Sequence, residues 1–337
     1  MIGTSFQWTW SSTSTVIAGT GVGGSLINQL WSPIRIMLDS SNSVVYIADS
    51  DNNRISKTTV GSSTLSIVAG QSSGQSGPNM TFLNRPSGVH VDPSGNIYIA
   101  DRSNHRVQLW KNNGSSITTV AGNGKFSRKY FFLLVNTDKC MYVGSLGTAL
   151  NQLNYPVSVT LDYSSQILYV ADTDNDRIIG VQLSTLTPSL AAGGNGAGYS
   201  SAQLYRPIDV YYDASSKSLF VANNYAHTVV RWAIGAGSWT LVAGTPSSYG
   251  STALTLWYPC GVTLDSSGNI YVADQFNHRI QFFTSGNLVG RTIAGQTSIP
   301  GSTSSLLSYP RSVAVDSQFN VYVSDTGNNR ILKFQAH

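Results

Sequence analysis

Hydrophobic residues in this chain occur in short runs separated by glycine, serine and asparagine, and the runs return at a nearly constant interval. The segment LNRPSGVHVDPSGNIYIADRSNHRVQLW, which begins at Leu83, returns as LWYPCGVTLDSSGNIYVADQFNHRIQFF from Leu256. A proline opens each of six copies, at Pro33, Pro86, Pro156, Pro207, Pro259 and Pro310. Such internal repetition predicts a repeat architecture.

The hydrophobic pattern within one unit predicts four short strands. In the second unit they cover residues 89–92, 97–100, 107–110 and 117–121. Short β runs divided by turn residues are typical of an antiparallel meander. One four-stranded sheet cannot cover both of its faces, so the copies must stack. Six such sheets around an axis predict an all-β fold, a single six-bladed β-propeller over residues 1–337.

The phase of the repeat predicts how the ring closes. The chain begins with a fourth strand, residues 14–18, and ends with a third strand, residues 331–334. We therefore expect the N-terminal strand to complete the sixth blade and leave no exposed edge.

The segments PSGVHVD, GNIYIAD and SNHRVQLW, with their counterparts in the fifth unit, resemble NHL repeats over nearly the whole chain. The resemblance implies six-bladed propellers used mainly as binding platforms, some of them for RNA or proteins. A related propeller enzyme is the peptidyl-hydroxyglycine amidating lyase, whose chemistry would need several histidines in the channel.

Five units carry an aspartate at the end of the second strand and an arginine five residues later. These pairs are Asp49 with Arg54, Asp101 with Arg106, Asp172 with Arg177, Asp274 with Arg279, and Asp325 with Arg330. Positions filled alike in the copies serve the repeat, so we expect the carboxylate to accept turn amides and the guanidinium to bridge strands or blades. The fourth unit has Asn223 and Thr228 instead.

The composition argues against catalysis. Only 11% of the residues are charged, and all sixteen acidic residues are aspartate. A glycosidase needs two facing carboxylates, and Asp209 is the one acid on an inner strand that the repeat does not explain. His105, His227 and His278 occupy one repeat position in three blades, which is expected to hold them too far apart for a zinc site. We expect no catalytic residue, no metal and no cofactor.

Positions that vary between copies are free to serve a ligand. Loops joining successive units and turns between second and third strands are expected on one face, where the inner strands begin. The ligand-binding candidates there are Arg35, Arg85, His90, Tyr155, Arg206, Asp209, Tyr211, Trp257, Tyr309 and Arg311. Arginine and aromatic residues are favoured interface anchors; the alternative is that the rings pack between blades.

An insertion at residues 125–143 distorts the charge balance. It carries a net charge of +3, whereas the whole chain carries +4. The remaining surface is therefore not the basic surface of a typical nucleic-acid binder. The insertion is either a functional loop or a translated intron, and sequencing of the transcript distinguishes the two.

These observations predict a non-catalytic, monomeric binding scaffold for a protein, peptide or glycan. The alternative is recognition of single-stranded RNA by arginine and aromatic side chains; a third is a metal-dependent lyase resembling the amidating enzyme. No apolar run is long enough to span a membrane, and no signal peptide is visible. Acceptor sequons at Asn79 and Asn113 favour an extracellular context if the chain is part of a longer one. If it is not, we expect a cytoplasmic protein.

Overall fold

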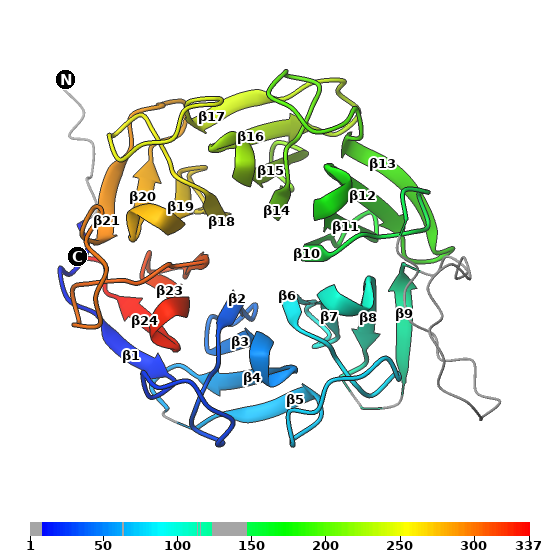
Figure 1. Ribbon diagram of the computed structural model, residues 1–337, viewed down its shortest axis with the longest axis horizontal. Coiled ribbons are helices and arrows are strands. Elements are labelled where there is room, and N and C mark those ends of the chain that lie inside the picture. The colour runs from blue at the N-terminus through cyan, green and yellow to red at the C-terminus, as the bar shows by residue number, and fades with distance from the viewer. Residues whose placement is uncertain (1–8, 63, 113, 115, 123–146) are drawn as a thin grey trace, which may run out of the picture.

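The computed structural model describes residues 9–62, 64–112, 114, 116–122 and 147–337. It confirms an all-β propeller of six four-stranded antiparallel sheets. The first strand of each blade lies near the centre and the fourth at the rim (Figure 1). The insertion at 125–143 lies outside the described residues, so neither interpretation of it is tested.

Each blade is a meander whose second and third strands are joined by a short 3-10 turn. The strands of the first three blades are β2 (Pro33–Leu38), β3 (Val44–Asp49), β4 (Arg54–Thr59), β5 (Ser66–Gly70), β6 (Pro86–Val91), β7 (Ile97–Asp101), β8 (Arg106–Trp110), β9 (Ile117–Ala121), β10 (Pro156–Asp162), β11 (Ile167–Asp172), β12 (Arg177–Gln182) and β13 (Thr187–Gly193). Those of the other three are β14 (Pro207–Asp213), β15 (Ser218–Asn223), β16 (Thr228–Ala233), β17 (Thr240–Gly244), β18 (Pro259–Leu264), β19 (Ile270–Asp274), β20 (Arg279–Phe283), β21 (Arg291–Gly295), β22 (Ser312–Val315), β23 (Val321–Asp325), β24 (Arg330–Phe334) and β1 (Thr15–Ala18). The turns are η1 (Ser50–Asn52), η2 (Arg102–Asn104), η3 (Thr173–Asn175), η4 (Asn224–Ala226), η5 (Gln275–Asn277) and η6 (Thr326–Asn328).

The N-terminal strand closes the ring, as the repeat phase predicts. β1 pairs antiparallel with β24 through Thr15 with Lys333 and Val16 with Leu332. Trp10 adds to this closure, because its ring packs against blade five at Phe282 and its Nε1 donates to a blade-six carbonyl. First and last blades are therefore joined by both backbone pairing and side-chain packing.

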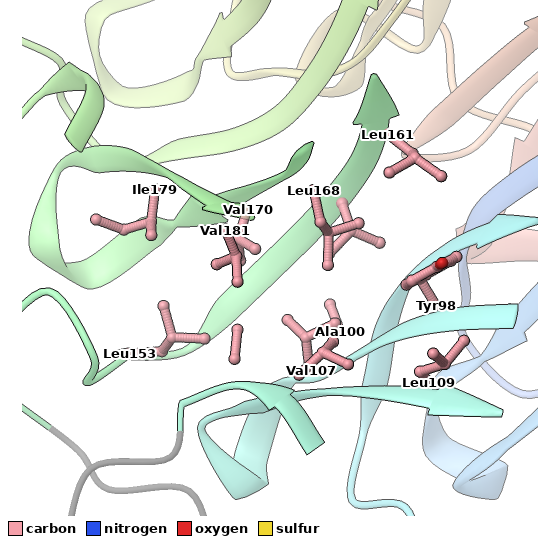
Figure 2. Close-up of a cluster of buried hydrophobic side chains, with 13 residues drawn as sticks. Tyr98, Ala100, Val107, Leu109, Leu153, Leu161, Leu168, Val170, Ile179 and Val181 are labelled. Atoms are coloured by element: carbon pink, nitrogen blue, oxygen red, sulfur yellow. The ribbon is translucent and has the colours of Figure 1, made fainter. Parts of the chain in front are cut away.

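The hydrophobic core is divided among the six interfaces between blades. Between the second and third blades, Ala100 and Val107 face Val170 and Ile179 (Figure 2). A leucine three residues before each proline is at most 1% exposed and seals the end of its interface; these are Leu30, Leu83, Leu153, Leu204, Leu256 and Leu307. Burying an aliphatic side chain contributes about 1.5–3 kcal/mol, so this repeated leucine fastens the blade-joining loop to the core.

Blade-joining loops and 3-10 turns meet at one end of the propeller, which we call the top face. In every blade the second residue of the turn donates its amide to the carbonyl two residues before the proline of the same blade, as Asp51 does to Trp31 at 3.1 Å. The structure thus brings together the two sets of segments that were expected to share a face.

Candidate functional site

The five aspartate–arginine pairs are buried ion pairs that hold the top-face loops. Their Nε to Oδ2 distances are 2.7–2.8 Å. In the first blade, Asp49 also accepts the Trp31 amide at 2.7 Å, and Arg54 donates to the Gln29 carbonyl at 3.0 Å. Each pair therefore fastens a blade-joining loop to its own blade and has no free group for a ligand.

The fourth blade achieves the same fastening without charge. Asn223 accepts the Tyr205 amide at 2.6 Å, as the aspartates do. Thr228 is too short to reach the loop, and the Trp239 Nε1 donates to the Gln203 carbonyl at 2.8 Å in place of an arginine. The Asn223 Nδ2 and the Thr228 Oγ1 find no hydrogen-bond partner among the described residues.

The residue that ends each 3-10 turn caps the next blade. His105, His227 and His278 adopt left-handed backbone conformations, and each accepts an amide through Nδ1 at 3.1–3.3 Å. Burial lowers the pKa of all three imidazoles, which keeps them neutral acceptors. The donors directly precede the prolines and are left-handed themselves, with φ of 48–52° throughout the set Ser32, Arg85, Tyr155, Arg206, Tyr258 and Tyr309.

Aromatic side chains from the loops and turns of blades four to six form a continuous chain across the top face. Seven contacts link eight rings at centroid distances of 5.1–5.9 Å. We call this set the aromatic belt; its members are Tyr199, Tyr205, Tyr225, Tyr249, Trp257, Tyr258, Phe276 and Tyr309. His227 and His278 pack edge-on against Tyr258 and Tyr309.

Exposed aromatic surface is concentrated on the top face. Seven aromatic side chains are at least 36% exposed in the described part of the chain: Trp31, Tyr155, Tyr163, Tyr199, Tyr249, Phe276 and Tyr309. Six of them belong to blade-joining loops or 3-10 turns, and Tyr163 alone lies in a turn at the opposite face. Large exposed aromatic groups that gather on one face mark an interaction surface.

An ion pair crosses the axis below the top face. Arg35 of β2 pairs with Asp209 of β14, which belongs to the opposite blade. The Asp209 carboxylate is fully buried and also accepts from Ser158 Oγ at 2.7 Å and from the Val262 amide at 2.8 Å. Burial lowers the pKa of Arg35 to about 10, so the arginine remains charged at neutral pH. These two predicted site residues are therefore paired with each other.

The structure places His90 and Tyr211 away from the top face. Each is the fifth residue of its inner strand, which starts at the top face. The aspartates whose charges affect their pKa, Asp92 for His90 and Asp213 for Tyr211, lie at the ends of these strands, at the opposite face. Burial and the Arg35 charge lower the pKa of His90 to about 4, against the influence of Asp92. Burial raises the pKa of Tyr211, whose ring packs in the core between blades four and five.

Two arginine candidates on the top face are paired with aspartates. Arg85 lies 3.1 Å from Asp51, and Arg206 lies 2.8 Å from Asp174. The Arg206 guanidinium also stacks over Tyr225 at 4.9 Å. Arg311 has no ion pair with any described residue, and Tyr155 contacts His105 rather than the belt.

Sequence reasoning missed several residues of this surface. Tyr225 and Phe276 occupy the second position of their turns, which is aspartate, serine or glycine in the other blades. This variation between copies is the feature of the sequence that indicates a candidate ligand-binding position. Tyr199 and Tyr249 lie in the blade-joining loops but several residues before the prolines, so the variation next to the prolines does not indicate them. Arg102, at the first position of η2, is also part of the top face.

Within the described ranges, no three histidine, cysteine or acidic side chains lie together as metal ligands. Burial raises the pKa of the Cys260 thiol to about 12, and its Sγ donates to Gln275. No helix in the part of the chain that the structure describes is long and apolar enough to cross a membrane.

Comparison with known proteins identifies the repeat. The family model "NHL repeat" matches residues 83–109, 256–283 and 307–334. The chain is 24% identical over 330 residues to Protein SUPPRESSOR OF QUENCHING 1, chloroplastic, from Arabidopsis thaliana, covering 89% of this chain and 30% of that protein. It is also 24% identical to human NHL repeat-containing protein 2, covering 71% of this chain and 37% of that protein. The chain therefore spans less than half the length of these relatives.

Solved structures share the fold at low sequence identity. An auxiliary nutrient binding protein from Bacteroides ovatus has a TM-score of 0.66 at 13% identity, covering 98% of this chain and 78% of that one. A streptogramin B lyase has a TM-score of 0.59, also at 13% identity, covering 98% of both chains. Binding proteins and enzymes thus occur on the same architecture, and the fold alone does not choose between them. The chain therefore carries NHL repeats at the three matched positions, within a propeller of six blades.

Proposed function

We propose that this NHL propeller is a non-catalytic binding module whose top face takes a peptide or protein segment. The observation that carries the proposal is that, among the described residues, six of the seven exposed aromatic side chains lie on that face. Aromatic residues are enriched where proteins bind one another, because they bury a large area at low cost in conformational entropy.

The composition of the belt supports a peptide over a nucleic acid. Single-stranded RNA needs a basic groove that follows the phosphates beside the stacking rings. At the rim of this face, Arg85 and Arg206 are each neutralised by an aspartate. A mostly neutral aromatic surface suits a polypeptide, whose charge is low and whose side chains are partly apolar.

The test selects peptides on the intact chain and then removes the exposed rings. A random peptide library is panned against the immobilised protein, and the affinity of selected peptides is measured for the variant Tyr249→Ser/Phe276→Ser/Tyr309→Ser. Tyr163→Ser is the matched control, because Tyr163 is 53% exposed on the opposite face. Thermal melting of each variant verifies that it is folded.

We expect the triple variant to bind at least about tenfold more weakly, since each hot-spot truncation costs more than about 1 kcal/mol. Tyr163→Ser should bind like the wild type. Equal binding by the triple variant, or failure to select any peptide, would overturn the proposal. Tight binding of an oligouridine at physiological salt, lost in the triple variant, would favour the RNA alternative.

A further inference from the structure

Two arginines at the top of the propeller axis are not used by the scaffold. Two rings of six residues surround the axis there: the first residues of the 3-10 turns and the residues that follow the prolines. The first ring is Ser50, Arg102, Thr173, Asn224, Gln275 and Thr326. The second is Ile34, Ser87, Val157, Ile208, Cys260 and Arg311. Arg102 and Arg311 are the only charged members.

In three other blades the residue at the position of Arg102 joins its blade to the next one by a hydrogen bond, whereas Arg102 makes no such bond to any described residue. Thr173, Asn224 and Thr326 each donate to the proline carbonyl of the next blade, at 2.8, 3.0 and 2.6 Å. In the second blade Ser87 makes the link to the next blade instead, because its Oγ donates to the Val157 carbonyl at 2.9 Å and lies 3.3 Å from the Pro156 carbonyl. The Arg102 side chain is therefore not needed to join its blade to the next one.

The described part of the protein leaves one buried donor of each guanidinium unpaired. The Nε atoms of Arg102 and Arg311 are buried and have no hydrogen-bond partner in the described residues. Their side chains form no ion pair there either, although Arg102 lies over the Tyr155 ring at 5.5 Å. A buried charged donor without an acceptor is strongly unfavourable, so a ligand that supplies an acceptor is bound favourably.

The two arginines make one positive locus. The axis is narrow enough that Arg35 of the first blade reaches Asp209 of the fourth, one level below. Burial and then the charge of Arg311 lower the pKa of Arg102, and the charges of Arg206 and Arg85 act in the same direction. Asp174, which would favour the charged form of Arg102, is already paired with Arg206.

We propose that Arg102 and Arg311 bind a carboxylate of the segment that lies on the aromatic belt, either an acidic side chain or a C-terminus. This inference rests on the proposed function and adds the ligand chemistry to it. A carboxylate offers two oxygens that match the planar fork of a guanidinium. One locus with two arginines suits a single anionic anchor, whereas a polynucleotide would require a row of unpaired cations.

The test uses small probes and reads the arginine side chains directly. N-acetyl-tyrosine carries a terminal carboxylate, N-acetyl-aspartyl-tyrosine amide carries a side-chain carboxylate, and N-acetyl-tyrosine amide carries neither. Each is titrated into the full ¹⁵N-labelled chain while the Nε–Hε resonances of Arg102 and Arg311 are followed by NMR. Assignment uses Arg102→Gln and Arg311→Gln, and the exposed Lys111→Gln is the control with the same change of charge.

We expect at least one carboxylate probe to shift both resonances and the amide to shift neither. Which carboxylate binds more tightly distinguishes a C-terminus from an acidic side chain. Each Arg→Gln variant should bind at least about tenfold more weakly, because a charged hydrogen bond is lost. The Arg→Lys variants should be intermediate, because they keep the charge and lose the fork, and Lys111→Gln should match the wild type.

Carboxylates that shift neither resonance, or that bind equally to the Arg→Gln variants, would overturn the inference. So would binding of inorganic phosphate without binding of either carboxylate. If these results occur while belt-selected peptides still fail to bind the Tyr249→Ser/Phe276→Ser/Tyr309→Ser variant, the proposed function stands and only the carboxylate site is lost. If neither the belt nor the arginines affect binding, both are lost.

Discussion

At the scale of single residues, the cap that ends each 3-10 turn shows how different side chains serve one repeat position. The position is Asn53, His105, Asp176, His227, His278 or Asn329, and in each case a side-chain oxygen or Nδ1 accepts the same amide of the next blade. The position requires a hydrogen-bond acceptor, which is neutral in the two asparagines and a carboxylate in Asp176. Histidine satisfies it only while its imidazole is neutral.

This requirement predicts a loss of stability in mild acid. Burial lowers the pKa of His105, His227 and His278 in the folded chain, whereas their pKa in the unfolded chain is about 6.5. The unfolded state therefore binds more protons below that pH, and stability present above pH 6.5 is lost as the pH falls. His90 contributes to the same decrease, because its folded pKa is about 4.

The variant His105→Asn/His227→Asn/His278→Asn separates the caps from His90. Asparagine keeps the acceptor and tolerates the left-handed backbone, as Asn53 and Asn329 do. Urea unfolding at pH 7.5 and 5.5 should show wild-type stability at pH 7.5 and most of the decrease at pH 5.5 removed. A decrease as large as that of the wild type would contradict the capping role.

The axial ion pair predicts unequal costs for its two partners. Without Arg35, the Asp209 carboxylate keeps Ser158 Oγ and the amides of Val210 and Val262 as donors. Without Asp209, those three donors and a buried guanidinium lose their acceptor. Asp209→Ala should cost about 3–5 kcal/mol and Arg35→Met about half of that or less. Urea unfolding measures both, and equal costs would refute this account of the axis.

At the scale of the element, the fourth blade shows how the buried ion pair of the other blades is replaced by uncharged residues. Asn223 and Thr228 replace the charged pair, and Trp239 takes over the contact with the Gln203 carbonyl. The exchange leaves two buried polar atoms without a partner in the described residues. The loop carbonyl that accepts from an arginine in the other blades is still present, and Trp239 now donates to it.

Restoring the pair predicts strong coupling between the two positions. Asn223→Asp alone buries an unpaired carboxylate and should cost about 2–4 kcal/mol, and Thr228→Arg alone should also destabilise. Together they should recover at least about 2 kcal/mol in a double-mutant cycle measured by urea unfolding. Additive costs would mean that blade four cannot form the pair.

The repeat made the fold predictable, and the same property limited prediction of the site. Strand order, ring closure and the Asp49–Arg54 type of pair follow from positions that recur in all or most copies. The belt depends on positions such as Tyr225 and Phe276, where only some blades carry a ring, and one copy cannot show which rings touch. The sequence does not indicate Arg102, because only the structure shows that Ser87 makes the link to the next blade in its place.

At the scale of the whole molecule, closure by β1 determines whether the ring is stable. Deleting residues 1–20 removes Trp10 from its site against Phe282 and leaves β24 as an exposed edge. The deletion should cost several kcal/mol of stability, and each kcal/mol lowers the melting temperature by a few degrees in a chain of this size. We therefore expect the melting temperature to fall by at least about 5 °C.

A circular permutant is the matched control for this deletion. The Thr9 carbonyl accepts the His337 amide at 2.8 Å, so a short glycine–serine linker from residue 337 to residue 9 can carry the strand to the other end of the chain. The permutant should melt within a few degrees of the wild type. An unchanged melting temperature after the deletion would refute closure by β1.

The two ends of the propeller differ in what they offer to a partner. The top face carries the aromatic belt together with Arg102 and Arg311, which form no ion pair with the residues that the structure describes. The opposite face carries turns closed by aspartates that accept their own backbone amides, as Asp92 does from Asn96 at 2.9 Å. A partner that binds by burying aromatic area therefore approaches the top.

Hydroxyl-radical footprinting with mass spectrometry tests this claim most directly. The intact chain is oxidised alone and with a peptide selected on it, and the oxidation of each exposed ring is compared. The account predicts that the peptide protects Tyr249, Phe276 and Tyr309 and leaves Tyr163 unchanged. Protection of Tyr163 with continued oxidation of the three belt residues would contradict it.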